Sequence, residues 1–308
     1  MAVEVPDRDD WFTLSYELPR PDWAAIGGWV RAFAEEDELN EVWRECTRHW
    51  LGRLRDALGG RYAVSESEHF QFLSTDPDKA TAKTLPFLEQ ARRHILKLLK
   101  VPLPLWHGKH VVLRFSELDD YDAYVSQFYP DGEFASAGGV FLSGGGYHHI
   151  AYPAVYLEAP ERPTLVHELT HNLLVSLPLP SWLNEALAMA FESDLTSSGH
   201  PPLSGDLAER HREWWDETRI QQFWRGESFH SVEGQELSYS LAEILLRLIH
   251  TDIRPTPLDF RRFVLRSCWG DAGAVASREH LGIELGELAS GFLGPGAWQP
   301  RPEEWRSR

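Results

Sequence analysis

The apolar positions of residues 22–58 repeat every three to four residues, which is the spacing of amphipathic helices. One such run spans residues 22–33, and a second spans residues 39–58, where Gly59-Gly60 ends it. Residues 1–20 are acidic and contain prolines, so we predict that they are irregular. The pattern therefore predicts an N-terminal helical element over residues 1–60.

Between residues 61 and 159 the pattern changes, because short runs rich in β-branched and aromatic residues alternate with helical stretches. The glycine triplet 144–146 separates two such runs and predicts a β-hairpin. The predicted strands are 61–65, 69–74, 109–116, 138–143 and 147–152, and the predicted helices are 77–100 and 117–128.

After Pro160 the pattern is helical throughout. The first helix should end before Pro178, and the later predicted helices are 181–194, 205–224, 236–250, 257–267 and 283–293. Strands followed by helices are typical of an α+β fold. We therefore predict a small mixed β-sheet with helices over residues 61–159, followed by a mainly α-helical part over residues 160–308.

Composition and charge narrow the choice of partners. The net charge of −17 repels phosphate backbones, so we expect no nucleic-acid partner. No apolar run approaches the roughly 18 residues of a membrane span, and no signal peptide opens the chain, so we expect a soluble cytoplasmic protein without a membrane partner. The two cysteines are too few for a disulfide framework or a thiolate metal site. We expect most of the thirteen tryptophans to fill the core.

The stretch His167-Glu168-Leu169-Thr170-His171 is the strongest chemical signal in the sequence. On a helix, residues four apart face the same way with Cβ atoms about 5–6 Å apart, which suits two imidazoles that bind one metal ion. Glu168 lies one position further round, where it can reach a water on the open side of the ion without being a ligand. The motif therefore predicts the chemistry of a zinc hydrolase.

The helix that contains this motif is apolar around most of its circumference, which is typical of a helix buried on several sides. Its apolar positions are 165, 166, 169, 173, 174 and 177. Two histidines and a carboxylate buried there without partners would each cost about 1–3 kcal/mol, whereas one metal ion with its water satisfies all three. A chance match to a five-residue pattern is the alternative.

A third ligand should come from the following helix. Pro178-Leu179-Pro180 is a short connection of the kind that joins antiparallel helices. If the first helix ends at residue 177, His171 lies about 9 Å before that end and Glu185 lies about 6 Å into the next helix. Glu185 therefore returns to the level of the histidines. The alanines at positions 186, 188 and 190 allow the two helices to approach closely.

These residues resemble those of a known family. His167-Glu-Leu-Thr-His171 followed by Trp182-Leu-Asn-Glu-Ala-Leu-Ala is similar to the gluzincin metallopeptidases, whose second signature is W-L-N-E-G-x-A. The resemblance is strongest to the peptidase-MA-like group of bacterial proteins and more distant to aminopeptidase N-like enzymes. It extends over about residues 61–294 and is most specific in the two motif helices.

The resemblance implies a gluzincin or thermolysin-like catalytic unit over residues 61–294. In such a unit His167, His171 and Glu185 bind Zn²⁺, and Glu168 is the general base. The strand around residues 147–152 would be the edge strand along which an extended substrate lies. No G-x-M-E-N stretch is present to hold a free amino terminus, which disfavours an aminopeptidase.

Four other side chains are weaker candidates. Tyr239 is placed by sequence order to donate to an oxyanion, and the alternative is a core tyrosine. Glu192, seven residues after Glu185, points within about 20° of the same direction and could accept the second N–H of a ligand histidine; otherwise it is a surface glutamate. His148 and His149 alternate along their strand, so at most one can face the site, and a structural role is the alternative for both.

We therefore expect a zinc-dependent peptidase whose substrate is a peptide or a protein, with Glu168 activating the water. The rival hypothesis is a non-catalytic zinc-binding or scaffold protein of peptidase ancestry. An intact Glu168 argues against it, because a purely structural zinc site does not need that residue. A coincidental motif in a helix bundle is the third alternative.

Overall fold

A computed structural model of the chain describes residues 4–100, 107–129, 138–154, 161–196 and 205–305. The chain forms two compact units, one containing Met1–His94 and Leu103–Asn172, the other containing Ile95–Pro102 and Leu173–Arg308. The sequence pattern suggested divisions near residues 60 and 160. Two of the boundaries between the compact units instead fall inside helices, after His94 and after Asn172. Residues 1–60 belong to the same unit as the β-sheet.

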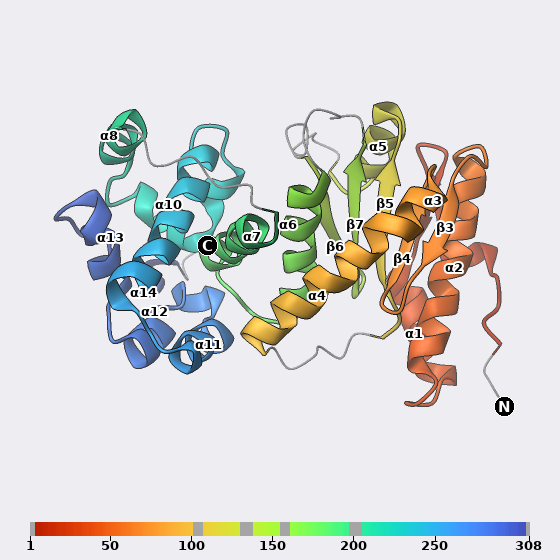
Figure 1. Cartoon of the computed structure of the whole chain (residues 1–308), viewed down its shortest axis with the longest axis horizontal. Helices are drawn as coiled ribbons and strands as arrows, with labels where there is room; N and C mark the ends of the chain where they lie inside the picture. Colours follow the sequence, from red (N-terminus) through yellow and green to blue (C-terminus); the bar gives the residue numbers. More distant parts are fainter. Residues whose placement is uncertain (1–3, 101–106, 130–137, 155–160, 197–204, 306–308) are drawn as a thin grey trace. The chain divides into compact units, whose positions relative to one another are not determined.

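The first unit is a β-sheet with helices on both of its faces (Figure 1). Its strands are β1 (Phe12–Ser15), β2 (Leu18–Pro21), β3 (Ala63–Glu66), β4 (Phe70–Ser74), β5 (His110–Phe115), β6 (Val140–Gly144) and β7 (Tyr147–Pro153). Its helices are α1 (Trp23–Phe33), α2 (Leu39–Ala57), α3 (Pro77–Lys79), most of α4 (Leu85–Leu99), α5 (Leu118–Val125) and most of α6 (Glu161–Leu174), with a 3-10 turn at Asp9–Trp11 and a π-turn at Ala80–Thr84.

Among the described residues, five strands form one mixed sheet in the order β3-β4-β5-β7-β6. The pairs β4–β5 and β5–β7 are parallel, and β3–β4 and β6–β7 are antiparallel. Neighbouring rows of side chains face opposite sides of the sheet. One row joins Phe72, Val112, Ile150 and Phe141, and the next joins Leu73, Leu113, Ala151 and Val140. The small mixed sheet predicted from the sequence is therefore confirmed.

The face that contains Leu73, Leu113 and Ala151 is covered by α1, α2 and α5, and together they form one hydrophobic core. Aromatic side chains dominate this core, as the tryptophan count suggested. Trp50 is fully buried, and Trp23 stacks on Tyr147 with ring centroids 3.9 Å apart. The long helices of the first sixty residues therefore hold the sheet rather than forming a separate element.

The opposite face is covered by α4, which crosses in front of the strands in Figure 1, and by α6. The guanidinium of Arg162 on α6 lies 4.7 Å from the ring centroid of Phe87 on α4, so the two helices are neighbours there. The sequence predicted one helix over residues 77–100, and the structure has a continuous helical stretch over Pro77–Leu99 in which Ala80–Thr84 is π-helical.

The prediction that residues 1–20 are irregular was wrong for residues 12–20. These residues form the hairpin β1–β2, with Ser15 opposite Leu18 and a two-residue turn at Tyr16-Glu17. Both turn residues have positive φ, a conformation usually taken by glycine or asparagine, so the letters give no turn signal. The prolines of β2 are tolerated because β2 pairs on one side only, with β1, among the described strands.

The turn between β6 and β7 requires glycine more strictly at one position than at the next. Gly145 and Gly146 have φ values of 58° and 83°. A Cβ atom on Gly145 would lie 2.9 Å from the backbone nitrogen of Ala24, whereas a Cβ on Gly146 would meet no atom within 4 Å. This tight contact sets the end of β6 against the start of α1.

Gly145→Ala should therefore destabilise the protein by about 2–4 kcal/mol, since the strain of positive φ is added to a backbone clash. Gly146→Ala should cost only about 1–2 kcal/mol, from the strain alone. Urea unfolding of both variants measures the difference. Equal losses would mean that the contact with α1 contributes nothing.

His149 of β7 lies in the core, where it is 2% exposed. The hydroxyl of Tyr124 on α5 and the Nε2 of His149 share a 2.6 Å hydrogen bond. Burial lowers the pKa of His149 from 6.5 to about 3, and the charge of His148 adds to the shift. Below pH 6.5 the imidazole of His149 becomes protonated in the unfolded chain, whereas in the folded protein it stays neutral down to about pH 3. The contribution of His149 to stability is therefore complete above pH 6.5 and declines as the pH falls towards 3.

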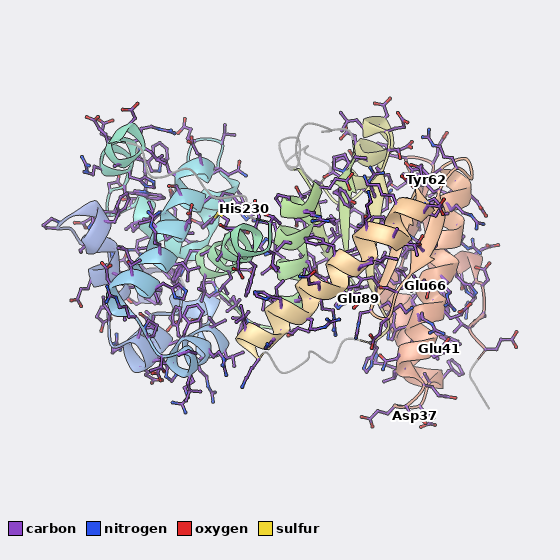
Figure 2. The ribbon with its side chains drawn as sticks, viewed as in Figure 1. Asp37, Glu41, Tyr62, Glu66, Glu89 and His230 are labelled. Carbon is purple, nitrogen blue, oxygen red and sulfur yellow. The ribbon has the colours of Figure 1, made fainter. Side chains whose placement is uncertain are left out.

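At pH 5 this loss amounts to about 2 kcal/mol relative to pH 7. His149→Gln, which keeps a polar partner for Tyr124, should weaken the pH dependence by that amount. Urea unfolding at pH 7 and pH 5 measures it, and His230→Gln is the control, since His230 is exposed (Figure 2). An unchanged slope in His149→Gln would show that His149 is protonated inside the fold.

The second unit is helical in its described residues. Besides the end of α4 and the last residues of α6, it contains α7 (Ser181–Thr196), α8 (Gly205–Trp214), α9 (Arg219–Arg225), α10 (Gln235–Leu248), α11 (Pro257–Arg266), α12 (Ala274–Ala276), α13 (Leu285–Leu293) and α14 (Pro302–Trp305). Single turns of 3-10 or π type lie at Glu227–His230, Ile249–Ile253, Trp269–Asp271 and Ser277–Leu281.

The single helix predicted over residues 205–224 is wrong, because α8 ends at Trp214 and α9 begins at Arg219. The carboxylate of Asp216 accepts hydrogen bonds from the backbone N–H groups of Thr218, at 2.9 Å, and Arg219, at 2.8 Å. Such a bond caps a new helix and ends the register of the old one.

Strands in the first unit and helices in the second confirm the predicted α+β class. Within the described ranges, no helix has the length and apolarity needed to cross a lipid bilayer.

Candidate metal centre

The motif helix α6 is held on several sides, as its apolar pattern predicts. Val166 and Leu169 are fully buried, and Leu165, Leu173 and Leu174 are each 1% exposed. The helix ends at Leu174, three residues earlier than predicted, and the N–H of Leu177 bonds to the carbonyl of Leu174 in the following turn. Because the apolar sides are fixed, the face that presents the histidines is fixed as well.

Ion pairs hold the start of α6. Glu161 accepts hydrogen bonds from Arg114 of β5 at 2.7 Å and from Lys79 at 3.3 Å. Burial alone would raise the pKa of Glu161, but the bonds to Arg114 and Lys79 outweigh it and hold this pKa below its usual value. A carboxylate in the first turn also favours the helix dipole.

Strand β6 lies close to the motif helix within the first unit. A Cβ atom on Gly139 would lie only 2.6 Å from the Cγ2 of Thr164, so the chain just before β6 touches α6. Further along, the ring of Phe141 lies 6.5 Å from the ring of His171 and 5.6 Å from that of His148, measured between centroids. These contacts place β6 beside the histidine face of α6.

His167, His171 and Glu185 form a group that could hold a metal ion. Each offers one ligand atom, and these three atoms lie within 4.8 Å of one another. The two imidazoles come from α6 and the carboxylate from α7. The return of Glu185 to the level of the histidines, inferred from helix lengths, stays a prediction. His171 is 8% exposed, and His167 and Glu185 are half-buried.

This group fits a zinc ion. Zinc bonds to nitrogen and oxygen are about 2.0–2.2 Å long, so any two ligand atoms on one ion are at most about 4.4 Å apart. The three ligand atoms lie within 4.8 Å of one another, which is close to that span. Two imidazoles and one carboxylate are a known donor set for catalytic zinc, in which one position stays open.

Glu168 lies beside this group without belonging to it. It follows His167 directly on α6 and is 9% exposed. It is not one of the three residues of the candidate metal group. A carboxylate that is close to an ion but not bound to it suits proton transfer rather than coordination.

Helix α7 is fixed in the second unit by the start of the W-L-N-E stretch. Trp182 is fully buried, donates from its indole nitrogen to the carbonyl of Ala272 at 2.9 Å, and packs edge-on against Trp224. Leu183 and Ala186 are also fully buried on either side of Glu185 along the chain. Trp182 therefore fixes the start of α7, and Glu185 lies about one helical turn after it.

The roles predicted for Glu192 and Tyr239 stay predictions. Glu192 is half-buried on α7, two turns after Glu185. Tyr239 lies in the first turns of α10, which packs against α7. Its ring is half-buried and packs edge-on against Phe229, with centroids 5.4 Å apart, so the packing role that was its alternative is present.

The prediction that residues 147–152 form an edge strand was wrong. These residues form β7, which pairs with β5 on one side and β6 on the other, so β6 (Val140–Gly144) is the outer strand. The two strands of the hairpin have similar patterns, and the sequence alone does not show which of them pairs with β5. As expected, His148 and His149 face opposite ways. His148 shares the side of Phe141, and His149 lies in the core.

Two further features had no sequence signal. Glu68, His69 and Glu89 also offer ligand atoms within 4.8 Å of one another, but Glu89, labelled in Figure 2, already accepts bonds from Ser67, from the backbone of His69 and from its ring. We therefore regard this group as a hydrogen-bonded cluster. The second feature is a pocket beside β6, whose walls come from three separate parts of the sequence.

Comparison with known proteins adds no assignment to this geometry. No protein-family model matches the sequence, and no curated protein matches it significantly. What can be said of the function therefore depends on the chemistry of His167, Glu168, His171 and Glu185.

Proposed function

We propose that this protein is a zinc-dependent metallopeptidase with a gluzincin-like catalytic unit. The observation that supports this most directly is the convergence of His167, His171 and Glu185 within 4.8 Å, with Glu168 next to His167 on the same helix. A purely structural zinc site has no need of an adjacent carboxylate and usually fills all four positions with cysteine and histidine. The part of the chain that the structure describes contains only two cysteines, Cys46 and Cys268, and neither belongs to this group.

When bound, zinc supplies a Lewis acid that polarises a carbonyl and makes water nucleophilic near neutral pH. Glu168 takes the proton of the attacking water and then passes it to the departing amine, acting first as a base and then as an acid. His167, His171 and Glu185 would hold the ion, and the pairing of Glu161 with Arg114 keeps the helix of the two histidines in position. Tyr239 is the proposed donor to the oxyanion, and Glu192 the proposed partner of a ligand histidine.

The substrate is an extended peptide that pairs with the outer side of β6. Among the described residues no strand occupies that side, and Phe141 of β6 lies beside His171. Backbone pairing with an edge strand binds peptides with little regard to their sequence. The chain has no G-x-M-E-N stretch to hold an amino terminus, so the proposed action is that of an endopeptidase.

Elemental analysis together with cleavage profiling on a proteome-derived peptide library tests the proposal. We expect about one zinc per chain and cleavage that a chelator abolishes and added zinc restores. Zinc without any cleavage would favour the rival, a zinc-binding protein of peptidase ancestry. Absence of zinc affinity would contradict both.

A further inference from the structure

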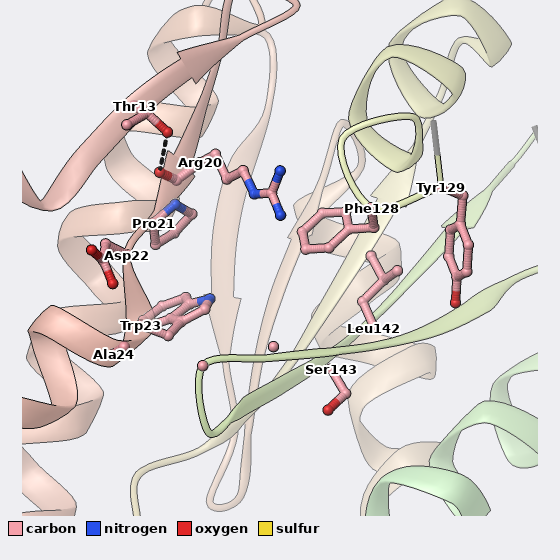
Figure 3. A pocket seen from close by; sticks show the side chains of 12 residues that line it. Thr13, Arg20, Pro21, Asp22, Trp23, Ala24, Phe128, Tyr129, Leu142 and Ser143 are labelled. Atoms are coloured by element: carbon pink, nitrogen blue, oxygen red, sulfur yellow. Dashed lines mark hydrogen bonds between the residues drawn. The ribbon is translucent and has the colours of Figure 1, made fainter. Parts of the chain in front are cut away.

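A pocket of about 490 Å³ lies at the far end of β6 from His171, within the first unit (Figure 3). Its volume is in the range of sites that bind small ligands or parts of a peptide. One wall is the end of β6, from Leu142 to Gly145. The others are the segment from Arg20 to Ala24 and the residues Phe128 and Tyr129.

Arg20 is the cation of this pocket. Figure 3 shows its side chain extending from β2 towards Phe128, and its guanidinium lies 5.2 Å from the centroid of that ring. One guanidinium nitrogen donates to the backbone carbonyl of Gln127 at 2.7 Å, which fixes the group in place. Arginine has five N–H donors in a planar fork, so most of its donors are left for a ligand.

No carboxylate among the described residues forms an ion pair with Arg20. Asp22, the acidic residue of the pocket, is used elsewhere. Its side chain accepts a hydrogen bond from the N–H of Ala25 at 2.9 Å, capping α1, and in Figure 3 it points away from the guanidinium. In a chain of net charge −17, a fixed cation without a carboxylate partner in a pocket is therefore a local attraction for an anion.

The pocket also lies on the proposed path of the substrate. Phe141, which is beside His171, and Gly144, which lines the pocket, are three residues apart on the same strand. Three residues of a strand span about 10 Å, so a peptide paired with β6 would reach the pocket two to four residues from the bond cleaved at the zinc. Trp23 and Phe128 provide apolar walls for the methylene groups of a side chain.

We propose that this pocket selects substrates with an acidic side chain, glutamate or aspartate, whose carboxylate binds Arg20. This rests on the proposed peptidase function and names a specificity-determining residue for it. A charge-assisted bond to a planar guanidinium recognises a carboxylate and discriminates against the matching amide. Because the pocket is remote from the reacting bond, Arg20 should act mainly on KM rather than on kcat.

Paired peptides that differ only by glutamate or glutamine provide the test. The probes derive from the best sequence of the cleavage profile, acetylated and amidated so that only a side chain supplies the carboxylate. We expect a kcat/KM about tenfold higher for the glutamate peptide at one position, two to four residues from the cleaved bond. In Arg20→Gln this ratio should fall to about one, and an unfolding transition equal to that of the wild type shows that the fold persists. Arg20→Lys should give an intermediate ratio.

Arg93→Gln is the matched control, since Arg93 is an exposed arginine on α4, which covers the opposite face of the sheet. Its ratio should equal that of the wild type. Two results would overturn the pocket assignment and leave the peptidase proposal standing. One is cleavage that depends on Glu168 but has a wild-type glutamate-to-glutamine ratio near one. The other is a ratio that Arg20→Gln does not change. Absence of zinc-dependent cleavage would instead contradict the proposed function, and the pocket assignment with it.

Discussion

Glu168→Gln is expected to lower kcat by about 10²–10⁴-fold while leaving zinc content unchanged, which is the typical contribution of a general base. Glutamine has nearly the shape of glutamate but cannot accept the proton of the attacking water. Zinc should be retained, because Glu168 is not among the three residues whose ligand atoms converge. Metal analysis and cleavage rates on the same protein sample measure both quantities.

The matched control is Glu209→Gln, which makes the same chemical change at an exposed position of α8. It should leave both the rate and the zinc content at wild-type values. A fully active Glu168→Gln enzyme would remove Glu168 from the mechanism. A variant that loses its zinc would instead make Glu168 a ligand or a structural support.

Glu185→Ala is expected to weaken zinc binding by more than about 100-fold. Loss of a partner that only orients a ligand already costs about 10–100-fold, and Glu185 would be one of three direct ligands. Activity should fall with the loss of metal. Competition with a chromogenic chelator measures the affinity without any need for turnover.

Thermal stability gives a second readout of the same prediction. A ligand at about 100 times its Kd stabilises a folded protein by about 2.7 kcal/mol, so zinc should raise the Tm of the wild type and not that of Glu185→Ala at the same concentration. Glu192→Gln is the informative comparison, since a residue that orients a ligand should reduce affinity by only about 10–100-fold. Wild-type zinc affinity in Glu185→Ala would contradict the proposed ligand set.

Local features of the fold follow the sequence closely. The helices α1, α2, α6 and α7 and the hairpin β6–β7 lie where periodicity and glycine placed them, to within a few residues at their ends. The predicted secondary structure was wrong at two places where the local sequence pattern did not match the structure. The turn Tyr16-Glu17 has no turn signal, and Asp216 starts a new helix inside a run of helical periodicity.

The proposed metal site was predictable for a similar reason. The spacing of His167 and His171 is set by the geometry of a single helix, and Glu185 returns because a short proline-containing connection leaves two adjacent helices few alternatives. His167, His171 and Glu185 are one of two groups among the described residues that could hold a metal ion.

The sequence by itself determined the helices, the hairpin and the spacing of the motif residues, because these depend on hydrogen bonds and periodicity within a few residues of one another. Only the tertiary structure decided that β6 rather than β7 is the outer strand, and that Arg20 meets Gln127 and Phe128 in a pocket beside that strand. Arg20 and Gln127 are 107 positions apart. Pairing of such distant segments depends on how whole faces of the sheet are buried, and no short window of sequence contains that information.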